Sequence, residues 1–234
     1  MDLFFHTSID TKDSMFSFND EESRHLSKVL RKQPGDVVAV TDGKGTEVIV
    51  EIQNISPRKS SGVITETILH PAPKHKTHIA IAPTKNIVRL EWFLEKATEI
   101  GIHRITPILC KHSERKMIKN ERLNKIIQAA LKQSQQFHLP KLDELKTFES
   151  FIEEQNGGYI AHCNPGTKQE LADLKSIVNS TCILIGPEGD FSVDEVTFAE
   201  KNNFKPVSLG KQRLRTETAA IVACHTLALI HRNL

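Results

Sequence analysis

Two glycine-containing segments near the C-terminus carry the residues best suited to bind a ligand and act on it. The first, residues 183–192 (ILIGPEGDFS), is typical of a buried strand followed by a tight loop. Gly186 and Gly189 allow the backbone to approach a ligand closely, and Pro187 stiffens the loop. The segment matches neither the P-loop nor the dinucleotide-binding pattern, so a phosphate cradle has little support. A plain turn between a strand and a helix is the alternative interpretation.

The second segment, residues 208–220 (SLGKQRLRTETAA), is typical of a strand, a basic loop and the start of an apolar helix. Arg215 and Glu217 lie where this helix begins, and an unpaired buried charge there would be costly. An arginine can stabilise a developing anion, and a glutamate can accept a proton or orient the arginine. The alternative is a structural Arg215–Glu217 pair with Thr216 as the helix N-cap.

The cysteines and histidines give no sign of a metal centre or a disulfide framework. The eleven histidines contain no HExxH motif, and the cysteines contain no CxxC pair. We therefore expect no metal cofactor and four reduced, mostly buried thiols, at Cys110, Cys163, Cys182 and Cys224.

The composition is that of an ordinary globular protein. The 234 residues include 31 Lys+Arg and 29 Asp+Glu, and 38% are hydrophobic, which allows one large domain or two small ones. No apolar run approaches the roughly 20 residues that cross a bilayer, and the N-terminus does not resemble a secretory signal, so we expect a cytoplasmic protein. Residues 111–125 carry six Lys/Arg against two acids, which indicates either a solvated helix face or a phosphate-contacting surface.

The first 70 residues predict a small β-rich unit. A short helix should begin after Asn19-Asp20, with Asp20 as its N-cap. Strands are expected over residues 37–41, 47–55 and 62–69, with a hairpin turn at residues 42–45 (DGKG). Residues 71–76 (PAPKHK) combine prolines and charges without periodicity, which favours a linker.

Residues 77–234 alternate between strand and helix patterns, which predicts an α/β domain with a parallel sheet and helices on both faces. Leu90, Phe93, Leu94 and Ala97 mark a helix that ends at Gly101, and Ser192 with Glu195 forms a capping box. Strands are expected at 77–82, 104–109, 159–162, 181–185 and 207–209, and the other helices at 123–131 and 216–231. Ligands of such sheets bind at the carboxyl ends of the strands.

Taken together, these segments resemble the RsmE family, ribosomal RNA small subunit methyltransferase E, of the SPOUT class. The matching segments are residues 25–31 (HLSKVLR) with 34–36 (PGD), 95–101 (EKATEIG), 132–134 (KQS) with Pro140, 185–189 (IGPEG), and 209–210 (LG) with 214–219 (LRTETA). They occur in the family's order over nearly the whole chain, and the last two in tandem are specific.

The resemblance implies an N-terminal PUA-like RNA-binding β-barrel over residues 1–70, a linker at 71–76, and a SPOUT methyltransferase domain over 77–234 that contains a trefoil knot. It also implies a homodimer without metal or membrane association. The implied reaction is transfer of a methyl group from S-adenosyl-L-methionine to N3 of a uridine near the 3′ end of 16S rRNA, in the assembled or assembling small ribosomal subunit. Rival interpretations are a SPOUT enzyme with another acceptor, such as a ribose 2′-hydroxyl or a tRNA base, and a non-enzymatic ribosome-assembly factor.

The resemblance also implies roles for individual residues. Arg215 and Glu217 are the candidate catalytic residues. The candidate cofactor-binding residues are His162, Leu184, Gly186, Pro187, Glu188, Gly189, Leu209, Gly210, Leu214, Thr216, Thr218 and Ala219. The candidate RNA-binding residues are His25, Lys28, Arg31, Lys111, Arg115 and Lys116. The chain departs from the family pattern at Asp190, where a second glycine is usual, and at Gln136, near which an arginine is often found.

Overall fold

A computed structural model describes residues 1–11, 13–174 and 180–232. The chain forms two compact units. The first contains Met1–Ala72 together with Leu131–Leu139, and the second contains Pro73–Ala130 and the chain from Pro140 onward. The sequence suggests one division near residues 71–76, but nothing in its pattern indicates that residues 131–139 return to the first unit.

The first unit is built on a curled five-stranded sheet with strand order β1-β3-β4-β5-β2. Its elements are β1 (Leu3–Phe5), β2 (Met15–Ser17), α1 (Asp20–Arg24), the π-helical turn η1 (His25–Val29), β3 (Val37–Thr41), β4 (Thr46–Asn54) and β5 (Ser61–Leu69). The pair β1–β3 is parallel and the other neighbours are antiparallel. Val48, Val50 and Ile52 alternate along β4 and are completely buried, as their spacing predicts.

Helix α1 is capped by Asn19, so the expectation that Asp20 is its N-cap is wrong. The Asn19 side chain accepts a hydrogen bond from the Glu22 N–H at 2.9 Å. Asn19 keeps an extended backbone, as an N-cap must, whereas Asp20 already belongs to the first helical turn, where its charge favours the helix dipole.

Residues 131–139 pack against the hairpin turn between β3 and β4. Leu139 N–H donates to the Gly43 carbonyl at 2.8 Å, and Gly45 N–H donates to the Phe137 carbonyl at 2.8 Å. The Phe137 ring stacks on His70 with centroids 3.7 Å apart. Gly45 has φ +101°, and a Cβ there would lie 2.7 Å from the His138 ring, so this turn requires glycine.

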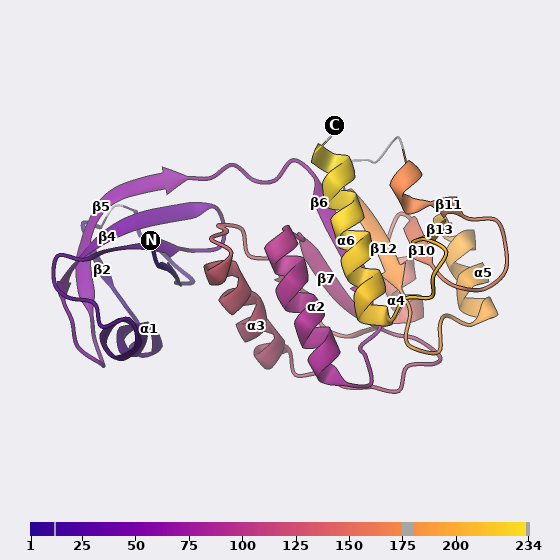
Figure 1. Cartoon of the computed structure of the whole chain (residues 1–234), viewed down its shortest axis with the longest axis horizontal. Helices are drawn as coiled ribbons and strands as arrows, with labels where there is room; N and C mark the ends of the chain where they lie inside the picture. Colours follow the sequence, from indigo (N-terminus) through magenta and orange to yellow (C-terminus); the bar gives the residue numbers. More distant parts are fainter. Residues whose placement is uncertain (12, 175–179, 233–234) are drawn as a thin grey trace. The chain divides into compact units, whose positions relative to one another are not determined.

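The second unit contains a fully parallel sheet with strand order β11-β13-β10-β12-β6-β7-β8, and β9 pairs with β7 (Figure 1). Its strands are β6 (Lys76–Ile81), β7 (Arg104–Leu109), β8 (Lys141–Leu142), β9 (Lys146–Thr147), β10 (Gly158–Ala161), β11 (Gln169–Glu170), β12 (Ser180–Ile185) and β13 (Phe204–Ser208). Its helices are α2 (Ile87–Ile100), α3 (Asn120–Gln133, whose last turn belongs to the first unit), α4 (Phe148–Glu153), the 3-10 turn η2 (Leu171–Asp173), α5 (Val193–Lys201) and α6 (Thr216–Arg232).

Helices cover both faces of this sheet. On one face, Ala80, Ile108 and Leu184 share a core with residues of α4 and α5, such as Phe148 and Val196. The opposite face is covered by α2 and α6, which pack against each other, and α6 also packs against β6 and β12 (Figure 1). The predicted α/β class is therefore confirmed. The trefoil knot stays a prediction of the family resemblance.

The predicted ends of α2 and α5 depend on local capping and are confirmed. Gly101 adopts φ +96° at the C-cap of α2, and its N–H bonds to the Ala97 and Thr98 carbonyls. Ser192 and Glu195 form the predicted capping box of α5. Among the described residues, none of the helices has both the length and the apolar character that a membrane crossing requires.

Candidate active site

A cleft with a volume of about 650 Å³ lies at the carboxyl ends of β10, β12 and β13 in the second unit. Three loops form most of its wall. The loop after β10 contributes Ala161–Cys163 and Lys168, and the loop after β12 contributes Ile185–Glu188 and Asp190. The end of β13 and the loop that precedes α6 contribute Val207–Thr216. These are the positions at which a parallel α/β sheet binds its ligands.

Most of the predicted cofactor residues line this cleft, namely His162, Gly186, Pro187, Glu188, Leu209, Gly210, Leu214, Thr216 and Ala219. Leu184, Gly189 and Thr218 do not line it. Leu184 points into the core shared with α4 and α5, and its neighbour Ile185 lines the cleft instead, because successive strand residues face opposite sides of a sheet. A Cβ added to Gly189 would lie 3.0 Å from the His112 Cβ, so this glycine allows the loop to pack closely against His112.

The glycine loop after β12 is held by three other segments of the second unit. The Thr216 hydroxyl, at the start of α6, donates to the Gly186 carbonyl at 3.1 Å. The Glu188 carboxylate accepts from the Lys85 N–H at 3.0 Å. Nδ1 of His112 lies 3.1 Å from the Gly189 carbonyl oxygen. These contacts fix the backbone of the loop before any ligand is bound, and Glu188 acts here as a loop-orienting residue.

Asp190 connects the loop after β12 to the loop after β10. Its carboxylate accepts from the Cys163 N–H at 2.7 Å and from the Phe191 N–H at 2.8 Å. Asp190 has φ +62°, a left-handed conformation that aspartate tolerates better than most residues. The departure from the family's glycine therefore keeps the backbone turn and adds a hydrogen-bonded link across the cleft wall.

His162 presents a neutral imidazole to the cleft. Both of its ring nitrogens are shielded from solvent and have no hydrogen-bond partner among the residues that the structure describes. Burial lowers the pKa of His162, and the nearby Lys168 ammonium lowers it further. Buried polar atoms without a partner are rare, so this imidazole is a candidate functional group beside the cleft.

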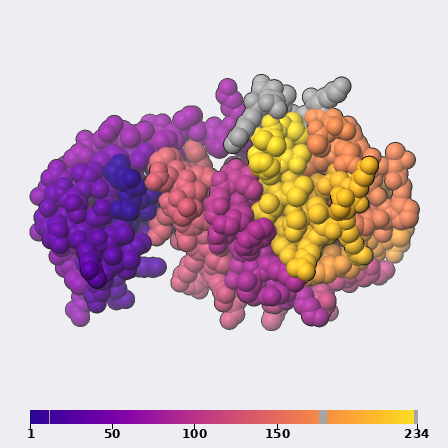
Figure 2. Space-filling view, viewed as in Figure 1, coloured from indigo at the N-terminus to yellow at the C-terminus, as the bar shows by residue number. Residues whose placement is uncertain are grey.

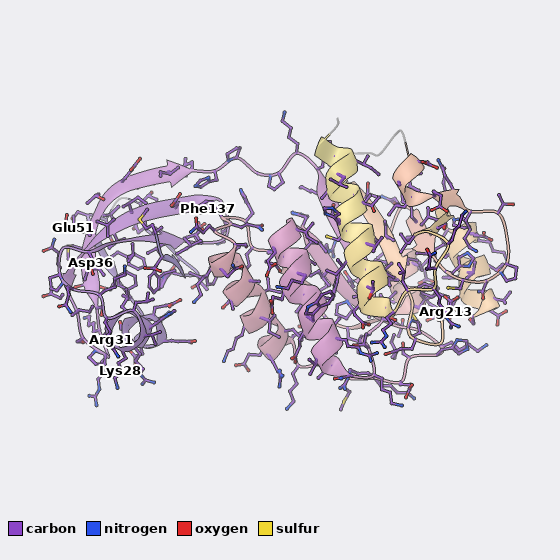
Figure 3. The ribbon with its side chains drawn as sticks, in the orientation of Figure 1. Lys28, Arg31, Asp36, Glu51, Phe137 and Arg213 are labelled. Carbon is purple, nitrogen blue, oxygen red and sulfur yellow. The ribbon has the colours of Figure 1, made fainter. Side chains whose placement is uncertain are left out.

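Sequence reasoning missed Lys168, Lys211, Gln212 and Arg213, which also line the cleft. Lys168 belongs to no recognisable motif and reaches the cleft only through the path of the loop after β10. The other three lie in the basic loop before α6, which was identified as a segment but not residue by residue. Figure 3 shows Arg213 on this loop, near the start of α6.

The two candidate catalytic residues have different surroundings. Arg215 lines the cleft, is exposed, and forms no ion pair with any described residue. Glu217 is buried and does not line the cleft. One of its carboxylate oxygens lies 3.6 Å from Arg89 Nε of α2, and the other has no hydrogen-bond partner within the described part of the chain. The alternative Arg215–Glu217 pair is not formed, because residues two apart at a helix start point in different directions.

The candidate RNA-binding residues lie in both units. In the first unit, Lys28 and Arg31 are exposed together beside α1 (Figure 3). Arg31 has φ +52°, and the next residue, Lys32, closes the turn with a 3.0 Å bond from its N–H to the Leu26 carbonyl. His25 is half-buried, with its ring edge-on to Phe4 at 5.8 Å.

In the second unit, Lys111, Arg115 and Lys116 follow β7. Lys116 is exposed, and Lys111 makes a loose 3.5 Å contact with Asp194. Arg115 instead donates to two backbone carbonyls of the loop after β6, to Thr84 at 3.0 Å and to Lys85 at 2.7 Å. Arg115 therefore helps to hold this loop, and its expected RNA-binding role stays a prediction. Gln136 lies in the first unit, where its N–H bonds to the Leu131 carbonyl.

Comparison with known proteins agrees with this architecture. A family model of the RNA methyltransferase domain matches residues 70–228, and a model of the RNA methyltransferase PUA domain matches residues 18–65. Ribosomal RNA small subunit methyltransferase E of Rickettsia conorii is 29% identical over 217 residues, which cover 91% of this chain and 88% of that protein.

Solved structures are also similar over the whole chain. The crystal structure of a probable rRNA-methyltransferase from Porphyromonas gingivalis has a TM-score of 0.90 and 35% identity, covering 100% of this chain and 99% of that one. A methyltransferase from Legionella pneumophila, solved with bound cofactor SAM, has a TM-score of 0.86 and 26% identity, covering 96% of each chain.

A parallel α/β domain with a three-loop cleft, joined to a PUA-like β-barrel, defines the protein as an RNA methyltransferase. More particularly, the chain belongs to the RNA methyltransferase family whose relatives are named ribosomal RNA small subunit methyltransferase E.

Proposed function

We propose that this chain transfers the methyl group of S-adenosyl-L-methionine to N3 of a uridine near the 3′ end of 16S rRNA in the small ribosomal subunit. The names of its relatives support an rRNA substrate, and the SAM-bound relative from Legionella pneumophila supports the cofactor. The observation that carries the proposal is the cleft at the strand ends, which combines the unsatisfied imidazole of His162 with the unpaired guanidinium of Arg215.

The residues of the cleft fit this cofactor. Ile185, Leu209 and Leu214 provide apolar surface for an adenine ring, and the glycine loop exposes backbone donors and acceptors beside them. His162 offers a donor and an acceptor that no described residue satisfies. S-adenosylmethionine, when bound, supplies an electrophilic methyl group on a sulfonium. The chain must hold donor and acceptor in line and keep water out of the cleft.

Arg215 is the residue we assign to the acceptor base. Uridine N3 becomes nucleophilic only when it loses its proton, and the negative charge then spreads over the two uracil carbonyl oxygens. A guanidinium at the cleft stabilises that charge, so that deprotonation occurs at neutral pH. The exposed and unpaired state of Arg215 supports this role, because an arginine already paired with a carboxylate would stabilise an anion less.

Glu217 takes a positioning role in this proposal. Its carboxylate contacts Arg89 of α2 and does not line the cleft. The contact joins the first turn of α6 to α2, and the same turn carries Thr216, whose hydroxyl holds Gly186. We therefore assign proton acceptance to solvent at the mouth of the cleft and not to Glu217.

The RNA is proposed to contact Lys28 and Arg31 of the first unit, with a weaker contribution from His25, and Lys111 and Lys116 of the second. Phosphate contacts of this kind orient a substrate without reading its sequence. Arg31 keeps a left-handed backbone, which costs a non-glycine residue about 1 kcal/mol or more. That strain supports a functional reason for an exposed arginine at this turn.

A homodimer that buries the outer face of α2 and α6 is part of the proposal. Figure 2 shows α2 and α6 side by side on one surface of the second unit. Val88 and Trp92 of α2 are 59% and 44% exposed, and Leu229 of α6 is 44% exposed. Large apolar side chains gathered on neighbouring helices favour a protein partner, and a second copy is the partner that the family resemblance implies.

The test is nucleoside mass spectrometry of 16S rRNA from cells with and without the gene. We expect N3-methyluridine to disappear without the gene, to return with the intact gene, and to stay absent with Arg215→Ala. Arg215→Lys keeps the charge and should restore part of the methylation. If another methylated nucleoside is lost instead, the acceptor is wrong. If complementation by Arg215→Ala is complete, the role of Arg215 is wrong.

A further inference from the structure

Lys168 is a half-buried cation in the cleft wall that the function proposed above does not yet use. It lies in the loop after β10, and its ammonium donates to the Asn164 carbonyl of the same loop. It forms no ion pair with any residue within the described ranges. The next residue, Gln169, pairs with Val207 of β13, which anchors the chain immediately after Lys168.

The acidic side chains of the cleft do not compensate this charge. The Asp190 carboxylate accepts from two backbone N–H groups, of Cys163 and Phe191. The Glu188 carboxylate is exposed and accepts from the Lys85 N–H. The ammonium of Lys168 therefore lines the cleft with a backbone carbonyl as its hydrogen-bond partner. An anionic group of a ligand would neutralise its charge.

Lys168 differs from the other cations of the cleft in its burial and its neighbours. Lys211, Arg213 and Arg215 are exposed and lie on the loop before α6. Lys168 is half-buried and lies close enough to His162 to influence that imidazole. A charge-assisted hydrogen bond is stronger where solvent is partly excluded, so an anionic ligand group gains more from Lys168 than from a fully exposed cation.

We propose that Lys168 binds the carboxylate of the methionine moiety of S-adenosylmethionine, with the unsatisfied imidazole of His162 beside it. This inference rests on the proposed function, because the cofactor has one carboxylate and that group requires a partner in the cleft. Lys168 is thus a specificity-determining residue that favours the complete cofactor over analogues without the carboxylate.

Isothermal titration calorimetry of the full chain tests the inference. The ligands are S-adenosylhomocysteine and its decarboxylated analogue, which keeps the amine and lacks the carboxylate. Lys168→Met should weaken S-adenosylhomocysteine binding about 10- to 100-fold, the usual loss for a charge-assisted hydrogen bond. It should not weaken binding of the decarboxylated analogue. Lys168→Arg keeps the charge and should recover most of the affinity.

Two further variants make the result interpretable. Lys168→Gln removes the charge but keeps a polar side chain of similar length, and should behave like Lys168→Met. Lys205→Met removes an exposed lysine of β13 that does not line the cleft, and should leave both affinities unchanged. Thermal melting of each variant checks that the fold is retained.

The outcomes separate this inference from the function beneath it. If Lys168→Met weakens both ligands equally, Lys168 only holds its loop, and the inference is wrong. If it weakens neither, the carboxylate lies elsewhere in the cleft. If the wild-type chain binds neither S-adenosylhomocysteine nor S-adenosylmethionine, the proposed function fails and this inference fails with it.

Discussion

A buried histidine should make the stability of this protein depend on pH well above the range in which carboxylates titrate. His78 of β6 is 5% exposed, and its Nε2 lies 2.8 Å from the Thr106 hydroxyl. That hydroxyl donates to Asp143, which also accepts from Arg104 Nε at 2.6 Å. Burial lowers the pKa of His78 to about 3, with the Arg104 guanidinium as the next cause. The imidazole is therefore neutral in the folded protein.

The sign and size of the effect follow from linkage. An unfolded histidine has a pKa of about 6.5, so below that pH the unfolded chain binds a proton that folded His78 does not take up until about pH 3. Stability therefore falls as the pH falls. Between pH 8 and pH 5 the free energy of unfolding should drop by about 2 kcal/mol from this residue alone.

Urea denaturation followed by circular dichroism at pH 8, 6.5 and 5 measures this drop. His78→Gln removes the titrating group, so the pH dependence over this range should shrink by about 2 kcal/mol relative to wild type. His225→Gln, which removes an exposed histidine of α6, should leave the pH dependence unchanged. If His78→Gln shows the full wild-type pH dependence, His78 is not held neutral, and the reasoning is refuted. The pKa of Asp143 is also lowered in the folded protein, so this carboxylate likewise makes stability fall as the pH falls, but at lower pH.

Three further predictions concern the cleft, the neighbouring loop and the dimer. Asp190→Asn tolerates the left-handed backbone but loses the charge that accepts the Cys163 N–H, so calorimetry should find S-adenosylhomocysteine bound about 3- to 10-fold more weakly. Unchanged affinity would contradict the link across the cleft wall. Arg115→Ala should lower the free energy of unfolding in urea by about 1–2 kcal/mol, since two carbonyls lose their donor, whereas Lys116→Ala should change it by less than about 0.5 kcal/mol. Equal effects of the two substitutions would show that Arg115 is not structural. Trp92→Glu should convert a dimer to a monomer in sedimentation velocity, whereas Val37→Glu, which changes an equally exposed residue of the first unit, should not. A dimeric Trp92→Glu protein would exclude the outer face of α2 and α6 as the interface.

Local sequence patterns predicted the secondary structure well where one physical signal dominates. The burial of Val48, Val50 and Ile52 follows from alternation along a strand, and the end of α2 at Gly101 follows from the left-handed C-cap that glycine adopts most easily. Where two residues could serve equally, as Asn19 and Asp20 could at the N-cap of α1, the pattern alone did not select the right one.

The candidate site was predictable to the level of its loops and less so to the level of side chains. Loops after parallel strands gather at one edge of the sheet, so the segments that carry Gly186 and Arg215 were expected to meet. The Leu184 side chain faces the core and Ile185 lines the cleft, because successive residues of a strand point to opposite sides of the sheet. Lys168 was missed because its position depends on the course of a loop that has no motif.

The sequence by itself determined the class of fold and the two segments that carry Gly186 and Arg215, because these depend on local periodicity and on residue types. Only the tertiary structure decided which charges remain available. Arg115 binds two carbonyls and Glu217 turns toward Arg89, whereas Arg215 and Lys168 face the cleft. A charge is available or committed according to neighbours that are distant in sequence, and that information exists only once the chain has folded.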